Sequence, residues 1–143
     1  MLRDELIRYY YPGNGHDFSC AEAMLHAMND YYDLDLPQEM FYAASAFSGG
    51  CWQNQMCGGL ASIAAVLGLL YSREGHGHSS RELKLLTIQL FSRVREKYGC
   101  TNCGSLKPLI HIPDRKCEPG LVEMCDIAEQ LISETEIINN RTV

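Results

Sequence analysis

The chain has 143 residues, of which 46% are hydrophobic and 21% charged, and its formal net charge is −6. This length and composition are typical of one globular domain that folds without disulfides or metals, so residues 1–143 are treated as a single Cys-rich domain. The acidic charge argues against a nucleic-acid partner, because phosphate binding depends on clustered Lys and Arg.

The N-terminal stretch MLRDELIRYYYPGNG contains acidic residues and lacks the apolar core of a signal peptide. The most apolar run, residues 60–71, is shorter than a membrane span. We therefore expect a cytoplasmic protein that does not associate with a membrane. In a reducing compartment, seven cysteines favour catalytic or metal-binding thiols over structural disulfides.

Helical spacing of apolar residues recurs along the whole chain. Two capping boxes, Ser19 with Glu22 and Ser79 with Glu82, mark the starts of the second helix and of a long later helix. The tetrapeptide LIHI is the one strand-like piece, and one strand makes no sheet. We therefore predict an all-α bundle of about five main helices. In chain order, six stretches carry the helical patterns from which about five main helices are expected: residues 2–11, 18–32, 36–48, 58–71, 80–98 and 118 onward.

The pattern over 58–71 differs from the others because its residues are apolar or small on every side, with no charge until Arg73. A helix that is apolar all round is a buried one, so we predict a buried central helix. Small residues at Gly59, Ser62 and Gly68 would let neighbouring elements approach closely.

Three cysteines fall at predicted helix starts: Cys20 in the second helix, Cys57 ahead of the buried helix, and Cys117 ahead of the last helix. A helix N-terminus offers free N–H groups and a partial positive charge, and both stabilise a thiolate. We therefore predict lowered pKa values at these cysteines, and we expect Cys57 to be the most reactive or most tightly metal-bound thiol.

The other cysteines and the histidines give less specific signals of function. Cys100 and Cys103 form a CxxC pair, which indicates a dithiol or half of a metal site. Cys125 lies on the apolar stripe of the last helix, which favours a plain core role. His26 on the second helix and His78 in the loop GHGH are candidate bases for a cysteine nucleophile, although a solvated loop is the simpler interpretation for His78.

Four sequence patterns now carry a resemblance to a known family. They are SCAEAML with Cys20, CGG with Cys57, YGCTNCGSL with Cys103 and KCEPGLV with Cys117. From about residue 18 to 132, the chain resembles the C_GCAxxG_C_C family of bacterial and archaeal proteins, to which redox activity is ascribed. Gly59 stands where the family usually has Ala. Cys51, Cys100 and Cys125 are extra to the pattern.

The resemblance implies that the four matched cysteines are the site residues, with Cys100 and Cys51 as second choices. It also implies that the glycine turns face them, at Gly49, Gly50, Gly58 and Gly59. A weaker resemblance to domains of split-Soret cytochromes implies that the four cysteines ligate an iron–sulfur cluster.

Short connections make successive helices antiparallel, which predicts that Cys57 and Cys103 lie at the same end of the bundle, together with Cys20 and Cys117. The leading hypothesis is a redox protein that uses either an iron–sulfur or other metal site or a dithiol/disulfide pair. The alternatives are a zinc-stabilised interaction module and a cysteine-nucleophile enzyme. The redox partner is unidentified, and a homodimer is left open.

Overall fold

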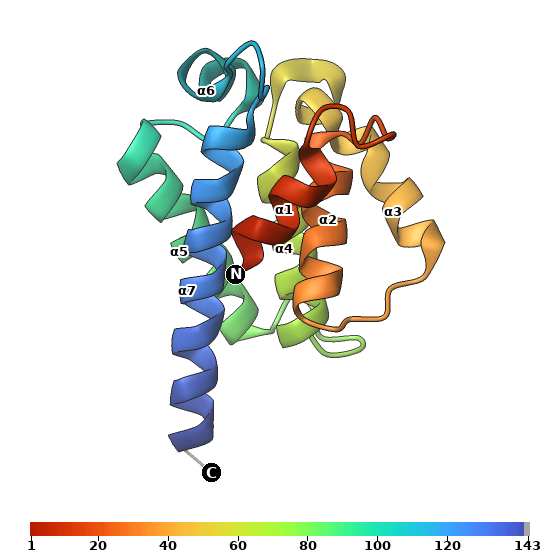
Figure 1. Cartoon of the computed structure of the whole chain (residues 1–143). Helices are drawn as coiled ribbons and strands as arrows, with labels where there is room; N and C mark the ends of the chain where they lie inside the picture. Colours follow the sequence, from red (N-terminus) through yellow and green to blue (C-terminus); the bar gives the residue numbers. More distant parts are fainter. Residues whose placement is uncertain (142–143) are drawn as a thin grey trace.

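The computed structural model describes residues 1–141 and is all-helical, as predicted, with seven α-helices in that part of the chain (Figure 1). A 3₁₀ turn and an irregular wide turn lie between α3 and α4. The helices are α1 (Leu2–Tyr10), α2 (Cys20–Tyr31), α3 (Gln38–Ala44), α4 (Gly58–Tyr71), α5 (Arg81–Tyr98), α6 (Cys103–Ile110) and α7 (Glu118–Arg141). The two turns cover Ser45–Phe47 and Gly50–Asn54.

Local capping explains where α2 begins, whereas the start of α5 is held by a contact with the end of α4. The predicted box at α2 is confirmed: the Glu22 N–H donates to Ser19 Oγ, and the Ser19 N–H donates to the Glu22 carboxylate, each at 3.2 Å. At α5 the predicted box is wrong, because Ser80 is the capping residue. Its hydroxyl donates to the Tyr71 carbonyl at 2.8 Å, so the start of α5 is held at the end of α4.

The prediction of about five main helices missed α6, and the strand-like LIHI is part of that helix and of the turn after it. Pro108 lies inside α6, which made a helix improbable from sequence. Burial of Leu106 (1% exposed) and Ile110 (5%) in the core favours the helix in spite of the proline. Within residues 1–141 the extended pairings are two isolated bridges, Met56–Asn102 and Ile112–Lys116.

Helix α4 packs against α2, α5 and α7. Its first three turns are largely buried, but Leu69 and Leu70 in the last turn are 48% and 38% exposed. The sequence predicted a helix buried on every side, but the last turn of α4 is partly exposed. The largest fully buried side chains of the core include Leu2, Leu6, Met24, Leu25, Met28, Leu60, Ile63, Leu67, Leu90, Leu106, Leu121 and Met124.

One end of the bundle gathers the helix starts. Figure 1 places α6, the turns before α4 and the beginnings of α2, α4 and α7 at the upper end, while α7 runs down the length of the molecule. Among the helices of residues 1–141, none has both the length and the apolar character needed to cross a membrane.

Candidate redox site

The four cysteines predicted to form the site each lie at the start of a helix. Cys20 is the first residue of α2, Cys57 caps α4, Cys103 is the first residue of α6, and Cys117 directly precedes α7. The sequence predicted this position for three of them and missed Cys103, because α6 was missed. Cys57 is buried, whereas the other three are partly exposed.

Backbone pairing joins Cys57 and Cys103, although they are far apart in sequence. The Cys57 N–H donates to the Thr101 carbonyl at 3.0 Å, and the Cys103 N–H donates to the Gln55 carbonyl at 2.6 Å. These two bonds flank the Met56–Asn102 bridge. The segment before α4 and the segment before α6 are therefore held side by side, which brings both cysteines to one point.

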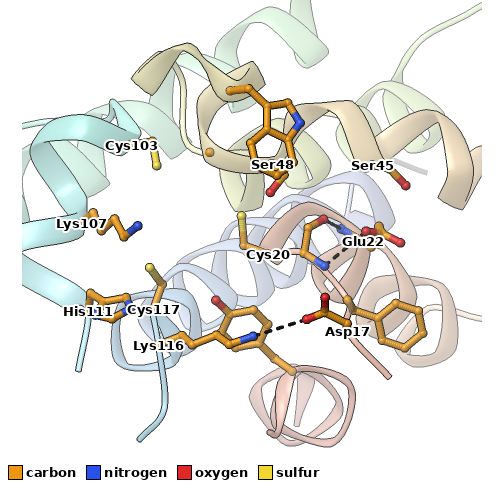
Figure 2. Close-up of a pocket in the computed structure, with 15 residues that line it drawn as sticks. Asp17, Cys20, Glu22, Ser45, Ser48, Cys103, Lys107, His111, Lys116 and Cys117 are labelled. Atoms are coloured by element: carbon orange, nitrogen blue, oxygen red, sulfur yellow. Dashed lines mark hydrogen bonds and ion pairs between the residues drawn. The ribbon is translucent and has the colours of Figure 1, made fainter. Parts of the chain in front are cut away.

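Three of the sulfurs face a shared cavity of about 480 Å³. Figure 2 shows Cys20, Cys103 and Cys117 pointing into it from α2, α6 and the start of α7. Cys57 does not line the cavity and is 6% exposed. It nevertheless lies close enough to Cys20 and Cys103 for their charges to raise its pKa. The structure thus brings Cys20, Cys103 and Cys117 to one cavity, while Cys57 lies near Cys20 and Cys103 but outside the cavity lining.

The glycines give the sulfurs space and N–H groups. A Cβ on Gly58 would lie 2.9 Å from Cys20 Sγ and 2.7 Å from the Phe47 carbonyl oxygen, so only glycine fits there. The backbone N–H groups of Gly49 and Gly59 both act to lower the pKa of Cys20. Gly49 and Gly50 have φ values of 59° and 63°, a conformation that favours glycine and that turns the chain over the cavity.

Burial decides the thiol pKa values in the metal-free protein. Burial, followed by the charge of Cys20, raises the pKa of Cys57 to about 12. Burial, then Cys20 and Cys103, raises the pKa of Cys117 to about 11. The pKa of Cys20 is also raised, mainly by burial. The predicted low pKa values are therefore wrong for the free thiols, because desolvation outweighs the helix N-terminus.

In a comparison with known protein families, residues 18–131 match the family model described as "Putative redox-active protein (C_GCAxxG_C_C)". The chain belongs to this family. No curated protein and no solved structure matches it.

The C_GCAxxG_C_C pattern does not include several polar residues of the cavity. Lys107 projects its ammonium group between Cys103 and Cys117 in Figure 2, and its charge lowers the pKa of Cys117. Tyr10, Trp52 and His111 also line the cavity. Neither Lys107 nor His111 was predicted as a site residue, because Lys107 lies in the missed helix α6 and His111 directly follows it.

The other candidates of the sequence lie apart from this family site. Cys125 is fully buried in α7, and its sulfur lies 3.6 Å from Met24 Sδ. Cys100 is half-buried in the segment between α5 and α6, and its thiol donates to the Tyr98 carbonyl at 3.6 Å. Cys51 is exposed on the turn before α4. The surroundings of Cys125 are consistent with its predicted core role. The two second-choice cysteines, Cys51 and Cys100, do not line the cavity.

The candidate bases also lie elsewhere. His26 is stacked on Phe41, with ring centroids 3.9 Å apart, and on Tyr9 at 4.9 Å, and burial lowers its pKa. His78 is in the exposed loop before α5. Neither histidine lines the cavity, where the ring of His111 is found instead. The structure thus brings neither predicted base to a cysteine of the site.

Within residues 1–141, no three His, Cys, Asp or Glu side chains are arranged to hold a single ion. The sulfurs of Cys20, Cys103 and Cys117 therefore share a cavity without forming the tetrahedral donor set of a structural zinc site.

Proposed function

We propose that Cys20, Cys57, Cys103 and Cys117 form a redox centre that holds an iron–sulfur cluster. The observation that carries this proposal is the convergence of three sulfurs on one cavity of about 480 Å³, with Cys57 near enough to Cys20 for the charge of Cys20 to raise its pKa. Fe–S clusters are held by four Cys thiolates, and this is the number of cysteines gathered here.

The surroundings fit an anionic group of this kind. The Lys107 ammonium projects toward the sulfurs, and the Gly49 and Gly59 N–H groups face Cys20. Metal binding releases the protons of cysteine ligands, so the raised thiol pKa values imply that cluster uptake strengthens as pH rises. When bound, the cluster would supply one-electron transfer, while the chain's own cationic and N–H groups stabilise its negative charge.

A dithiol/disulfide pair is the second candidate. Cys20 and Cys57 pack against neighbouring residues of the same glycine pair: a Cβ on Gly58 would lie 2.9 Å from Cys20 Sγ, and a Cβ on Gly59 would lie 3.7 Å from Cys57 Sγ. In this reaction the two thiols form one S–S bond and pass two electrons and two protons to an oxidant. A zinc module has less support, because no three donors in the described residues are arranged for one ion.

Anaerobic purification, followed by reconstitution with iron and sulfide, tests the proposal. Brown protein with matching iron and sulfide contents and a reducible visible absorption band supports the cluster. Colourless protein with one reversible disulfide among the four cysteines supports the second candidate. One tightly bound zinc per chain, with no redox response, would contradict both and support the interaction module.

A further inference from the structure

The only tryptophan of the sequence lies at the edge of the cavity with most of its surface open to solvent. Trp52 lines the cavity, and 72% of its surface is exposed. Tryptophan is highly buried on average, and an indole combines a large apolar face with one N–H donor. An exposed indole beside a cavity is therefore a surface on which a ligand can stack, and the redox centre gives it no other role.

The backbone holds this indole in place at a conformational cost. Four successive residues have left-handed φ values, which are 59°, 63°, 58° and 56° for Gly49, Gly50, Cys51 and Trp52. The conformation is unfavourable for Cys51 and Trp52, because each carries a Cβ. The Gln55 N–H closes the turn by donating to the Gly50 carbonyl at 3.1 Å. A Cβ on Gly49 would lie 3.8 Å from Trp52 Cε3, so the indole lies against the turn itself. Strained residues of this kind cluster at ligand-binding sites, where one orientation is required.

The cavity extends beyond the sulfurs. Figure 2 shows Cys103 and Cys117 on one side of it and Ser45 and Glu22 on the other, with Ser48 between them. Its volume of about 480 Å³ lies in the range of small-molecule sites, roughly 300–1,000 Å³. The serine hydroxyls along it can donate and accept hydrogen bonds. There is therefore room for a small molecule beside the sulfurs.

The charges of the lining favour an anionic group on that molecule. The Asp17 carboxylate lies 3.8 Å from Lys116 Nζ, and the Glu22 carboxylate accepts the Ser19 N–H at 3.2 Å, so both acids have a partner. Within residues 1–141, no carboxylate is paired with Lys107, whose ammonium projects into the cavity in Figure 2. An ammonium has three donor hydrogens, so it can face the sulfurs and a ligand together.

We propose that the cavity binds a small planar ring that carries an anionic group, with the ring stacked on Trp52 and the anionic group held by the Lys107 ammonium. Both residues line the same cavity, so one ligand can reach both. The inference goes beyond the proposed function, because it concerns the space beside the sulfurs and needs no cluster. Flavin mononucleotide (FMN), a planar ring with a phosphate group, has this chemistry and is the probe for the test.

Equilibrium dialysis of the reduced protein against FMN measures the affinity, and quenching of the fluorescence of the single tryptophan reports where FMN binds. Trp52→Leu is compared with Tyr42→Leu, which removes an aromatic ring that is 68% exposed and lies outside the cavity lining. Lys107→Met is compared with Lys84→Met, at an exposed lysine of α5. All four side chains are exposed, so the variants should fold, which thermal unfolding verifies.

We expect FMN to quench the wild-type fluorescence, and its affinity to fall about tenfold in Trp52→Leu and about tenfold in Lys107→Met. Tyr42→Leu and Lys84→Met should keep the wild-type affinity. Riboflavin, which has the ring without the phosphate, should bind the wild type about tenfold more weakly than FMN. Absence of FMN binding, or an unchanged affinity in Trp52→Leu or in Lys107→Met, would overturn the inference.

The same dialysis on protein reconstituted with iron and sulfide separates this inference from the proposed function. FMN binding by protein that takes up no iron would support the inference and overturn the cluster. Iron and sulfide uptake by protein that binds no FMN would leave the cluster and overturn the inference. Loss of FMN binding on iron loading would also overturn it, because the ring would then occupy the space of the cluster rather than the space beside it.

Discussion

Cys57 and Cys125 are both buried, with 6% and 0% of their surfaces exposed, yet their surroundings differ. Around Cys57 there are glycines, two other nearby thiols and the free N–H groups of a helix start; the Gly59 and Leu60 N–H groups act to lower its pKa. Around Cys125 there are the thioether of Met24 and the aliphatic core. Burial raises the pKa of both thiols, so burial alone does not distinguish the proposed site cysteine from the core cysteine. The two differ in the N–H groups and thiols that surround them.

The largest expected effect tests this difference directly. Cys20→Ala should abolish the iron and sulfide uptake of the reconstituted protein, since it removes one of the three sulfurs that face the cavity. Cys125→Ala should retain the full iron content, because Cys125 lies in the core of α7. Iron and sulfide analysis after desalting measures both. Equal loading of the two variants would show that the cavity cysteines do not form the centre.

Gly58 provides the next test, on the space that the site requires. Gly58→Ala places a Cβ 2.9 Å from Cys20 Sγ and 2.7 Å from a backbone oxygen, and it should destabilise the protein by about 1–3 kcal/mol. Gly68→Ala in the same helix has no heavy atom within 4 Å of the new Cβ and should stabilise it by about 0.5–1 kcal/mol. Urea unfolding of the metal-free proteins measures both.

A stabilising Gly58→Ala would mean that the sulfur and the Phe47 carbonyl can move aside, and that the glycine is not required for packing. Reduced iron loading of a Gly58→Ala protein that still folds would show instead that the close approach of Cys20 to α4 serves the centre. Gly68→Ala, loaded in parallel, controls for any general effect on α4.

The sequence predicted the cysteine end of the bundle better than it predicted the helices that build it. The capping box at Ser19 and the glycines before α4 are local signals, and they placed Cys20 and Cys57 correctly at helix starts. Helix α6 was missed because Pro108 is a local signal against a helix. Its formation depends on burying Leu106 and Ile110 in the core, which only the tertiary structure defines.

The wrong thiol pKa values have a similar cause. A helix N-terminus can be predicted from capping residues, but desolvation depends on the elements that pack over it. Cys57 is covered by segments from elsewhere in the chain, so its pKa rises to about 12 despite its position. Tyr10 and Lys107 were not foreseen for the same reason: α1 and α6 reach the cavity only through the packing of the whole bundle.

The pH dependence of stability sharpens the comparison of the two buried thiols. A thiol whose pKa is higher in the folded than in the unfolded state contributes stability that is complete below the unfolded value, 9.0, and is lost as pH rises through the folded value, about 12 for Cys57. The reduced, metal-free protein should therefore lose stability from about pH 9 upward. Thermal unfolding between pH 7 and 10.5 measures the slope.

Loading the protein with iron separates the contributions of Cys57 and Cys125 to the pH dependence of stability. Site cysteines bound as thiolates no longer carry a proton, so the slope attributed to Cys57 should disappear in the loaded wild type. The contribution of Cys125 to the pH dependence of stability should persist. The slope of stability against pH should therefore differ between wild type and Cys125→Ala by the same amount with and without iron. An unchanged wild-type slope after loading would indicate that Cys57 keeps its proton and is no ligand.

The smallest effect is expected at Met24, which lies next to the surroundings of both Cys57 and Cys125. It is fully buried, its sulfur lies 3.6 Å from Cys125 Sγ, and its methyl carbon would lie 3.7 Å from a Cβ on Gly59. Met24→Leu keeps the volume and should cost less than about 1.5 kcal/mol, with unchanged iron content. Because contacting residues couple, its cost should not add to that of Cys125→Ala, whereas it should add to that of a distant substitution such as Gly68→Ala. Iron loading that falls with Met24→Leu would show that the core around Cys125 positions the site, and that the two regions are not independent.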